Sequence, residues 1–216
     1  MQLIDFILNI DQHLVGIVNN FGNWTYLILF LIIFIETGLV VFPFLPGDSL
    51  IFAASAMAAN PKYALNIWLA YFIFLLAAIL GDTINYEIGR WSAKKGSEKN
   101  WFNKLINQDK RAAAEHFFEQ HGGKTIVIGR FIPFIRTFVP FVSGAGKMSY
   151  RHFIAYNFLG GFLWVSLFSI IGYFFGNFPV VQDHFSLIVV AIILVSVVPI
   201  IIVYLRKKIT QRRQLR

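Results

Sequence analysis

Two carboxylates, Glu36 and Asp48, stand inside one of the most apolar stretches of the sequence, residues 34–48. The same stretch holds two prolines and two glycines, the residues that continue a helix least well. A charged side chain inside a bilayer costs several kcal/mol, so such residues are rare and usually functional. A broken backbone at membrane depth is tolerated only where protein surrounds it or where it lines a wet cavity. This stretch therefore predicts an interior site rather than a simple spanning helix.

The composition identifies the class of protein. Of the 216 residues, 57% are hydrophobic and only 14% are charged, whereas soluble domains carry roughly a quarter charged residues. An integral membrane protein is therefore predicted. The net charge of +8 comes mostly from basic blocks beside apolar segments, which is typical of cytoplasmic flanks and of contact with anionic lipids rather than with nucleic acid.

Several kinds of chemistry are excluded by the residues present. The absence of cysteine excludes thiolate metal sites and a cysteine nucleophile. Neither Gly-x-Ser-x-Gly nor His-Glu-x-x-His occurs, so the common hydrolase signatures are missing. We therefore expect no enzyme, no cofactor and no bound metal.

The first half of the chain predicts three elements. Residues 1–22 place apolar side chains at helical spacing between acids, which favours an amphipathic interfacial helix, with a plain packing helix as the alternative. Residues 24–60 form two apolar arms around a Pro-Gly break, which favours a re-entrant hairpin over one kinked helix. Residues 64–82 suit a spanning helix of ~20 residues. Asp82 stands near its expected end, so a simple helix-end role competes with a functional one.

The second half of the chain mirrors this pattern. Residues 125–148 are again apolar and broken by proline and glycine, but they contain Arg130 and Arg136, and they predict a second re-entrant hairpin. The flanking elements are a basic cytoplasmic segment, two spanning helices and a basic cytoplasmic tail, at residues 90–124, 153–176, 185–205 and 206–216.

The two hairpins are predicted to enter from opposite faces of the membrane. Residues 43–47 and 140–144 share the form P-F-x-x-G, and inverted repeats with broken helices are a known transporter plan. The predicted fold is an all-α polytopic membrane protein, with two oppositely oriented re-entrant hairpins, about three spanning helices and an N-terminal amphipathic helix.

If the hairpins meet, their unlike charges share one pocket in which each offsets the burial cost of the other. Arginine offers a planar fork that suits phosphate oxygens, and a carboxylate shielded from water can exchange a proton near neutral pH. The alternative is a static set of salt bridges that pins the hairpins together. The residues expected to support the site are Pro46, Gly47, Asp82, Gly144 and Asn157.

The sequence closely resembles the DedA family of bacterial inner-membrane proteins in three motifs, E-T-G-L-V-V-F-P-F-L-P-G-D, G-D-T-I-N-Y-E-I-G-R and G-R-F-I-P-F-I-R-T-F-V-P-F-V-S-G-A-G-K-M. The resemblance covers nearly the whole chain. It implies a fold with two re-entrant hairpins, related to eukaryotic lipid scramblases. It also implies translocation of polyprenyl phosphate, notably undecaprenyl phosphate, with dependence on the proton-motive force. The membrane-embedded acids and arginines that the family needs match Glu36, Asp48, Arg130 and Arg136.

The leading expectation is a lipid-phosphate flippase in the bacterial inner membrane, with a cytoplasmic C-terminus. Arg130 and Arg136 would hold the phosphate, while Glu36 and Asp48 would exchange protons. Expected partners are membrane lipids, with polyprenyl phosphate or a phospholipid as substrate, and a homo-oligomer is left open. The alternatives are a proton-coupled transporter of small ions or drugs, a scramblase of phospholipids such as phosphatidylethanolamine, and a membrane-bound lipid phosphatase.

Overall fold

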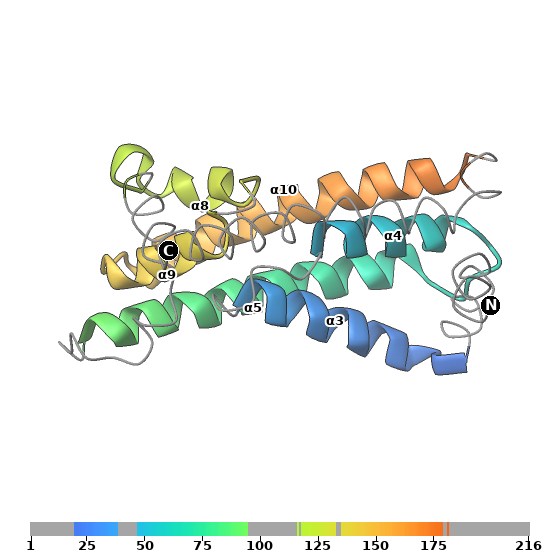
Figure 1. Ribbon diagram of the computed structural model, residues 1–216, viewed down its shortest axis with the longest axis horizontal. Coiled ribbons are helices and arrows are strands. Elements are labelled where there is room, and N and C mark those ends of the chain that lie inside the picture. Colours follow the sequence, from blue (N-terminus) through green and yellow to red (C-terminus); the bar gives the residue numbers. More distant parts are fainter. Residues whose placement is uncertain are drawn as a thin grey trace, which may run out of the picture.

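The computed structural model describes residues 20–38, 47–94, 116, 118–132, 135–178 and 181. All regular structure in these ranges is helical, which confirms the all-α prediction for the part of the chain that is described. The helices, labelled in Figure 1, are α3 (Asn23–Gly38), α4 (Gly47–Ala59), α5 (Ile67–Lys94), α8 (Lys124–Gly129), α9 (Phe138–Ala145) and α10 (Tyr150–Gly176).

Several predicted elements fall outside the described ranges. They are most of the interfacial helix at 1–22, most of the basic segment at 90–124, the last expected span at 185–205 and the tail at 206–216.

Two of the described helices are long and apolar enough to cross a membrane, Ile67–Ala93 and Tyr150–Gly176, with 27 residues each. At 1.5 Å per residue each extends about 40 Å, more than the ~30 Å of bilayer hydrocarbon. The second of these helices begins three residues before the predicted span at 153–176.

The first long helix differs from its prediction. The expected span at 64–82 ends at Asp82, whereas α5 continues to Lys94. Both Asp82 and Asn85 are buried within this helix, at 4% and 0% exposure. The helix-end interpretation of Asp82 is therefore wrong. Asp82 and Asn85 lie in the interior, where residues of other segments supply their ion-pair and hydrogen-bond partners.

The remaining helices are too short to span a bilayer. The first pair, α3 and α4, have 16 and 13 residues, and residues 39–46 between them are not described. The second pair, α8 and α9, have 6 and 8 residues. Each pair begins one residue before the predicted hairpin, at Asn23 and Lys124 against 24–60 and 125–148, and otherwise falls within it. In Figure 1 the first pair lies toward one end of the molecule and the second pair toward the other.

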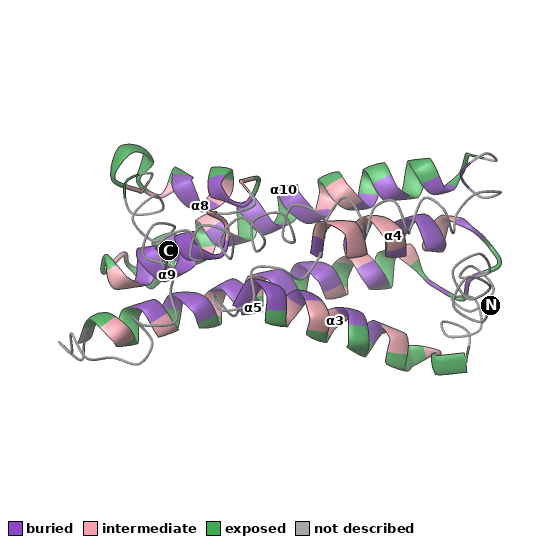
Figure 2. Ribbon diagram, viewed as in Figure 1, coloured by how far each residue is buried: buried purple, intermediate pink, exposed green. Residues whose placement is uncertain are grey.

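Each long helix supports short helices from both halves of the chain. The most extensive contacts of α5 are with α3 and α9, whereas α10 packs most extensively against α4 and also contacts α5 and α8. The largest apolar cluster lies among α3, α4, α5 and α10, and includes Ile33, Ile51, Phe74 and Trp164. Figure 2 shows the buried residues on the inward faces of the helices and many exposed ones on outward faces. Exposed aromatic side chains such as Trp68 fit a lipid-facing surface.

Glycines allow the backbones of α4 and α10 to approach closely. A Cβ atom on Gly172 would lie 2.4 Å from the carbonyl oxygen of Phe52, and one on Gly176 would lie 2.4 Å from that of Ala56. Small residues at such crossings let helices pack tightly in a membrane, where burial of apolar surface contributes little.

Gly172→Ala should therefore destabilise the fold, because the added methyl group meets a backbone atom that cannot move aside. We expect a loss of about 1–3 kcal/mol, measured by thermal unfolding in detergent. Gly161→Ala on the same helix is the matched control, since its Cβ would meet nothing closer than 3.5 Å. Equal unfolding temperatures for the two variants would contradict this account of the packing.

Candidate functional site

Arg136 joins the two pairs of short helices. It lies in the turn before α9, and its Nη2 donates to Glu36 Oε1 near the end of α3. Its Nη1 donates to Asp48 Oδ1, in the first turn of α4, at 2.6 Å. The Glu36 side chain is fully buried, that of Arg136 is 12% exposed and that of Asp48 is 34% exposed. The two predicted hairpins thus contribute opposite charges to one shared interior site.

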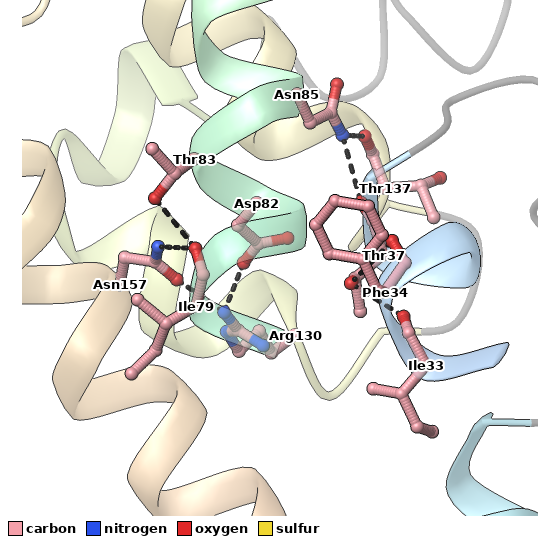
Figure 3. A network of polar contacts seen from close by, with 10 residues as sticks. All are labelled: Ile33, Phe34, Thr37, Ile79, Asp82, Thr83, Asn85, Arg130, Thr137 and Asn157. Atoms are coloured by element: carbon pink, nitrogen blue, oxygen red, sulfur yellow. Dashed lines mark hydrogen bonds and ion pairs between the residues drawn. The ribbon is translucent and has the colours of Figure 1, made fainter. Parts of the chain in front are cut away.

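Arg130 forms a third ion pair, with a carboxylate that Arg136 does not bind. It caps the C-terminus of α8, and its Nη2 donates to Asp82 Oδ2 on α5 and to Asn157 Oδ1 on α10 (Figure 3). Asn157 in turn donates from Nδ2 to the carbonyl oxygen of Ile79, at 3.1 Å. The sequence interpretation places both arginines with Glu36 and Asp48. The structure places only Arg136 there and pairs Arg130 with Asp82.

Trp164 on α10 contacts both arginines and Asp48. Its Nε1 donates to Asp48 Oδ1 at 2.8 Å, the same oxygen that accepts from Arg136. Its ring centroid lies 5.9 Å from Cζ of Arg130 and 5.8 Å from Cζ of Arg136, within the range of cation–π attraction. The sequence predicts no role in the site for Trp164. The one feature of the sequence that could have indicated this role is the tryptophan itself, because a buried indole N–H usually has a hydrogen-bond acceptor.

Asn85 on α5 forms hydrogen bonds to the end of α3 and to the start of α9, beside the ion pairs. Its Nδ2 donates to the carbonyl oxygen of Thr137 at 2.6 Å and, at 3.4 Å, to that of Thr37 (Figure 3). These carbonyl groups lie at the end of α3 and just before α9. A broken helix exposes such groups, and burial without a partner would be costly. Asn85 was not predicted, because its acceptors come from distant parts of the chain.

The predicted supporting residues take different positions. Asp82 and Asn157 contact Arg130, as described above. A Cβ atom on Gly47 would lie 2.7 Å from Glu36 Oε2, so the missing side chain lets α4 begin against Glu36. A Cβ atom on Gly144 would lie 2.0 Å from the carbonyl oxygen of Tyr86, which brings α9 onto α5. Pro46 lies outside the described residues.

The space between the two arginines is small. The cavity between the arginines has a volume of about 10 Å³, the space of about one water molecule. It is lined by Thr37, Asp82, Arg130, Arg136, Thr137 and Trp164. Within the described ranges no group of three or more His, Asp or Glu side chains is placed to hold a metal ion. The expectation of no metal stays a prediction.

A double-mutant cycle can measure the buried pair of Arg130 and Asp82. Asp82→Asn leaves the guanidinium buried without its counter-charge, which should cost about 3–5 kcal/mol in free energy of unfolding. The double variant Asp82→Asn/Arg130→Gln should recover part of this loss, as measured by thermal unfolding in detergent. If the losses of the two single variants simply add in the double variant, the pair does not act as a unit.

Comparison with known proteins gives one consistent family. The VTT domain profile matches residues 45–174, a range that contains Asp48, both arginines and Trp164. The chain is 52% identical over 207 residues to "Protein DedA" of Escherichia coli (strain K12), which covers 95% of this chain and 94% of that protein. It is 34% identical over 173 residues to "Inner membrane protein YqjA" of the same strain, covering 80% and 77% of the two chains.

A second organism supplies a further relative. The "Uncharacterized membrane protein ML0287" of Mycobacterium leprae (strain TN) is 39% identical over 171 residues, covering 79% of this chain and 75% of that one. No solved structure matches the chain. The apolar composition, the two long apolar helices and these relatives agree: the chain is a membrane protein and belongs to the VTT-domain family of DedA-type proteins.

Proposed function

We propose that the protein is a transporter that moves a lipid phosphate, undecaprenyl phosphate in particular, across the bacterial inner membrane, coupled to the proton-motive force. The observation that carries this proposal is Arg136, a guanidinium enclosed among apolar helices and held by carboxylates of two other helices. The choice of a polyprenyl phosphate rests on the resemblance to the DedA family. We expect no covalent change in the lipid, so the protein would act as a carrier and not as an enzyme.

The two arginines suit a phosphate group. A phosphate monoester carries about −1.5 to −2 charges near pH 7, and two guanidiniums can neutralise it. Arginine stays charged when buried, and its fork matches phosphate oxygens. Both guanidiniums approach the Trp164 ring, so a group bound beside that ring can reach both.

The charge balance of the site supports proton coupling. Its three carboxylates, on Glu36, Asp48 and Asp82, face two guanidiniums, so a fully ionised site would carry one net negative charge. An uncompensated charge in an apolar interior is costly, and one bound proton removes it. A carboxylate that a phosphate displaces from the guanidinium of Arg136 loses its counter-charge and needs a further proton. Binding of the anion and uptake of protons are thus linked.

The arrangement of the helices supports alternating access. We infer that α3 with α4, and α8 with α9, are re-entrant hairpins that enter from opposite faces, and that the C-terminus is cytoplasmic. Short helices that reach only partway across would place Arg136 near the middle of the membrane. Two ion pairs link the α5 group of helices (α3, α5, α9) to the α10 group (α4, α8, α10), Arg130 with Asp82 and Arg136 with Asp48.

A relative movement of the two groups would therefore open the site. The close glycine contacts of Gly172 and Gly176 lie inside the α10 group, and that of Gly144 lies inside the α5 group. Between the groups, Tyr71 and Ser166 share a hydroxyl contact at 2.8 Å and Asn157 donates to the carbonyl oxygen of Ile79 at 3.1 Å, beside the apolar cluster among α3, α4, α5 and α10. Polar contacts can exchange partners during such a movement, whereas the tightly packed contacts within each group would persist.

Replacing Arg136 with Lys should strongly reduce transport. Lys keeps the positive charge but cannot bind Glu36, Asp48 or a phosphate with a planar fork. In proteoliposomes with an imposed pH gradient, we expect translocation of undecaprenyl phosphate to slow by about tenfold or more, which corresponds to about 1.4 kcal/mol.

Arg90→Lys is the matched control, because the Arg90 side chain is 45% exposed and its ion pair with Glu87 spans 3.7 Å. Equal rates for Arg136→Lys and the wild type would remove Arg136 from the mechanism. Release of inorganic phosphate from the lipid would indicate a phosphatase, and flux of small ions without the lipid would indicate an ion transporter.

A further inference from the structure

We propose that the carboxylate of Asp48 occupies the position where the substrate phosphate binds. This position, the seat, is formed by Nη1 of Arg136 and Nε1 of Trp164. Trp164 is then a phosphate-binding residue that donates to the anion when Asp48 is displaced. This inference rests on the proposed function and specifies its binding site. The ligand is the phosphate group of a lipid monophosphate.

Two donors converge on one oxygen of Asp48. Oδ1 accepts from Nη1 of Arg136 at 2.6 Å and from Nε1 of Trp164 at 2.8 Å. An anionic oxygen held by a guanidinium and a second N–H group is the arrangement that a phosphate oxygen takes in a binding site. The carboxylate therefore acts as an internal stand-in for the substrate anion.

Asp48 is better placed to leave this seat than Glu36. Both carboxylates contact Arg136, but the Asp48 side chain is 34% exposed, whereas that of Glu36 is fully buried. The backbone of Gly47 also closes over Glu36, since any Cβ atom there would lie 2.7 Å from its Oε2. Asp48 can therefore turn away from Arg136 while Glu36 stays in place.

The size of the cavity requires displacement. The cavity between Arg130 and Arg136, about 10 Å³, has room for about one water molecule and none for a phosphate group. Both Nη atoms of Arg136 already donate to carboxylates, so a phosphate oxygen can take one of these hydrogen bonds only if a carboxylate leaves. The seat thus holds one anion at a time, either that of Asp48 or that of the substrate.

Trp164 is fixed in a way that keeps its N–H group aimed at the seat. The residue is 2% exposed and belongs to the apolar cluster among α3, α4, α5 and α10, so its orientation does not depend on Asp48 alone. The indole N–H can only donate, so it suits an anion and cannot bind a cation through hydrogen bonding. Once Asp48 leaves, a phosphate oxygen is the acceptor that replaces it.

Binding of labelled farnesyl phosphate to the purified protein in phosphatidylcholine nanodiscs tests the competition. Asp48→Asn keeps the shape of the side chain but removes its charge, so the probe should bind about tenfold more tightly than to the wild type. Glu87→Gln, an exposed site on α5, is the control and should bind as the wild type does. Glu36→Gln also removes one negative charge beside Arg136 but leaves the charged Asp48 carboxylate in the seat, and should tighten binding less than Asp48→Asn.

Trp164→Phe tests the donor and keeps an aromatic ring beside the arginines. Binding should weaken about fivefold, both in the wild type and in the Asp48→Asn background. If Trp164 served only to hold Asp48, its loss would free the carboxylate and have no effect in that background. Trp68→Phe is the matched control, because Trp68 is 70% exposed on the outer face of α5.

The outcomes separate this inference from the proposed function. Absence of farnesyl phosphate binding to the wild type would overturn both. Binding that Asp48→Asn leaves unchanged or weakens would overturn the inference alone, as would an equal or greater tightening by Glu36→Gln. Displacement of the probe by inorganic phosphate at similar concentrations would assign the seat to free phosphate and overturn the lipid assignment.

Discussion

One constraint governs the structure: charged side chains buried in its apolar interior must have partners of opposite charge. Glu36, Asp82 and Arg130 are each at most 6% exposed, and an unpaired ion in such surroundings would cost several kcal/mol. Pairing them requires that α3 end, α4 begin and α9 begin around the guanidinium of Arg136, and that α8 end against α5. The breaks in the helices are therefore part of the site.

Two kinds of contact hold the helices together. Glycines bring backbones close between α4 and α10, and between α5 and α9, where the geometry permits little variation. Charges and hydroxyl groups join the resulting groups of helices beside the apolar cluster that α3, α4, α5 and α10 share, and such polar contacts can exchange partners with a substrate or with water. A stable scaffold and a changeable interior can therefore coexist in a small membrane protein.

The sequence predicted the members of the site better than their pairing. Glu36, Asp48, Arg130 and Arg136 stand out because each charge interrupts an apolar run beside proline or glycine. Asp82 was misplaced because an acid within a long helix looks, in sequence, like an acid at the end of a shorter one. The donors from Asn85 and Trp164 could not be foreseen, since their acceptors lie 48, 52 and 116 positions away. Long-range geometry decides such contacts, and local patterns do not encode it.

The most direct test of the central claim is the amount of undecaprenyl phosphate exposed on the outer face of the inner membrane, in cells with and without this protein. If the protein returns the lipid to the cytoplasmic face, the exposed pool should be larger without it. The wild-type chain should restore the smaller pool. An exposed pool of the same size with and without the protein would contradict the account.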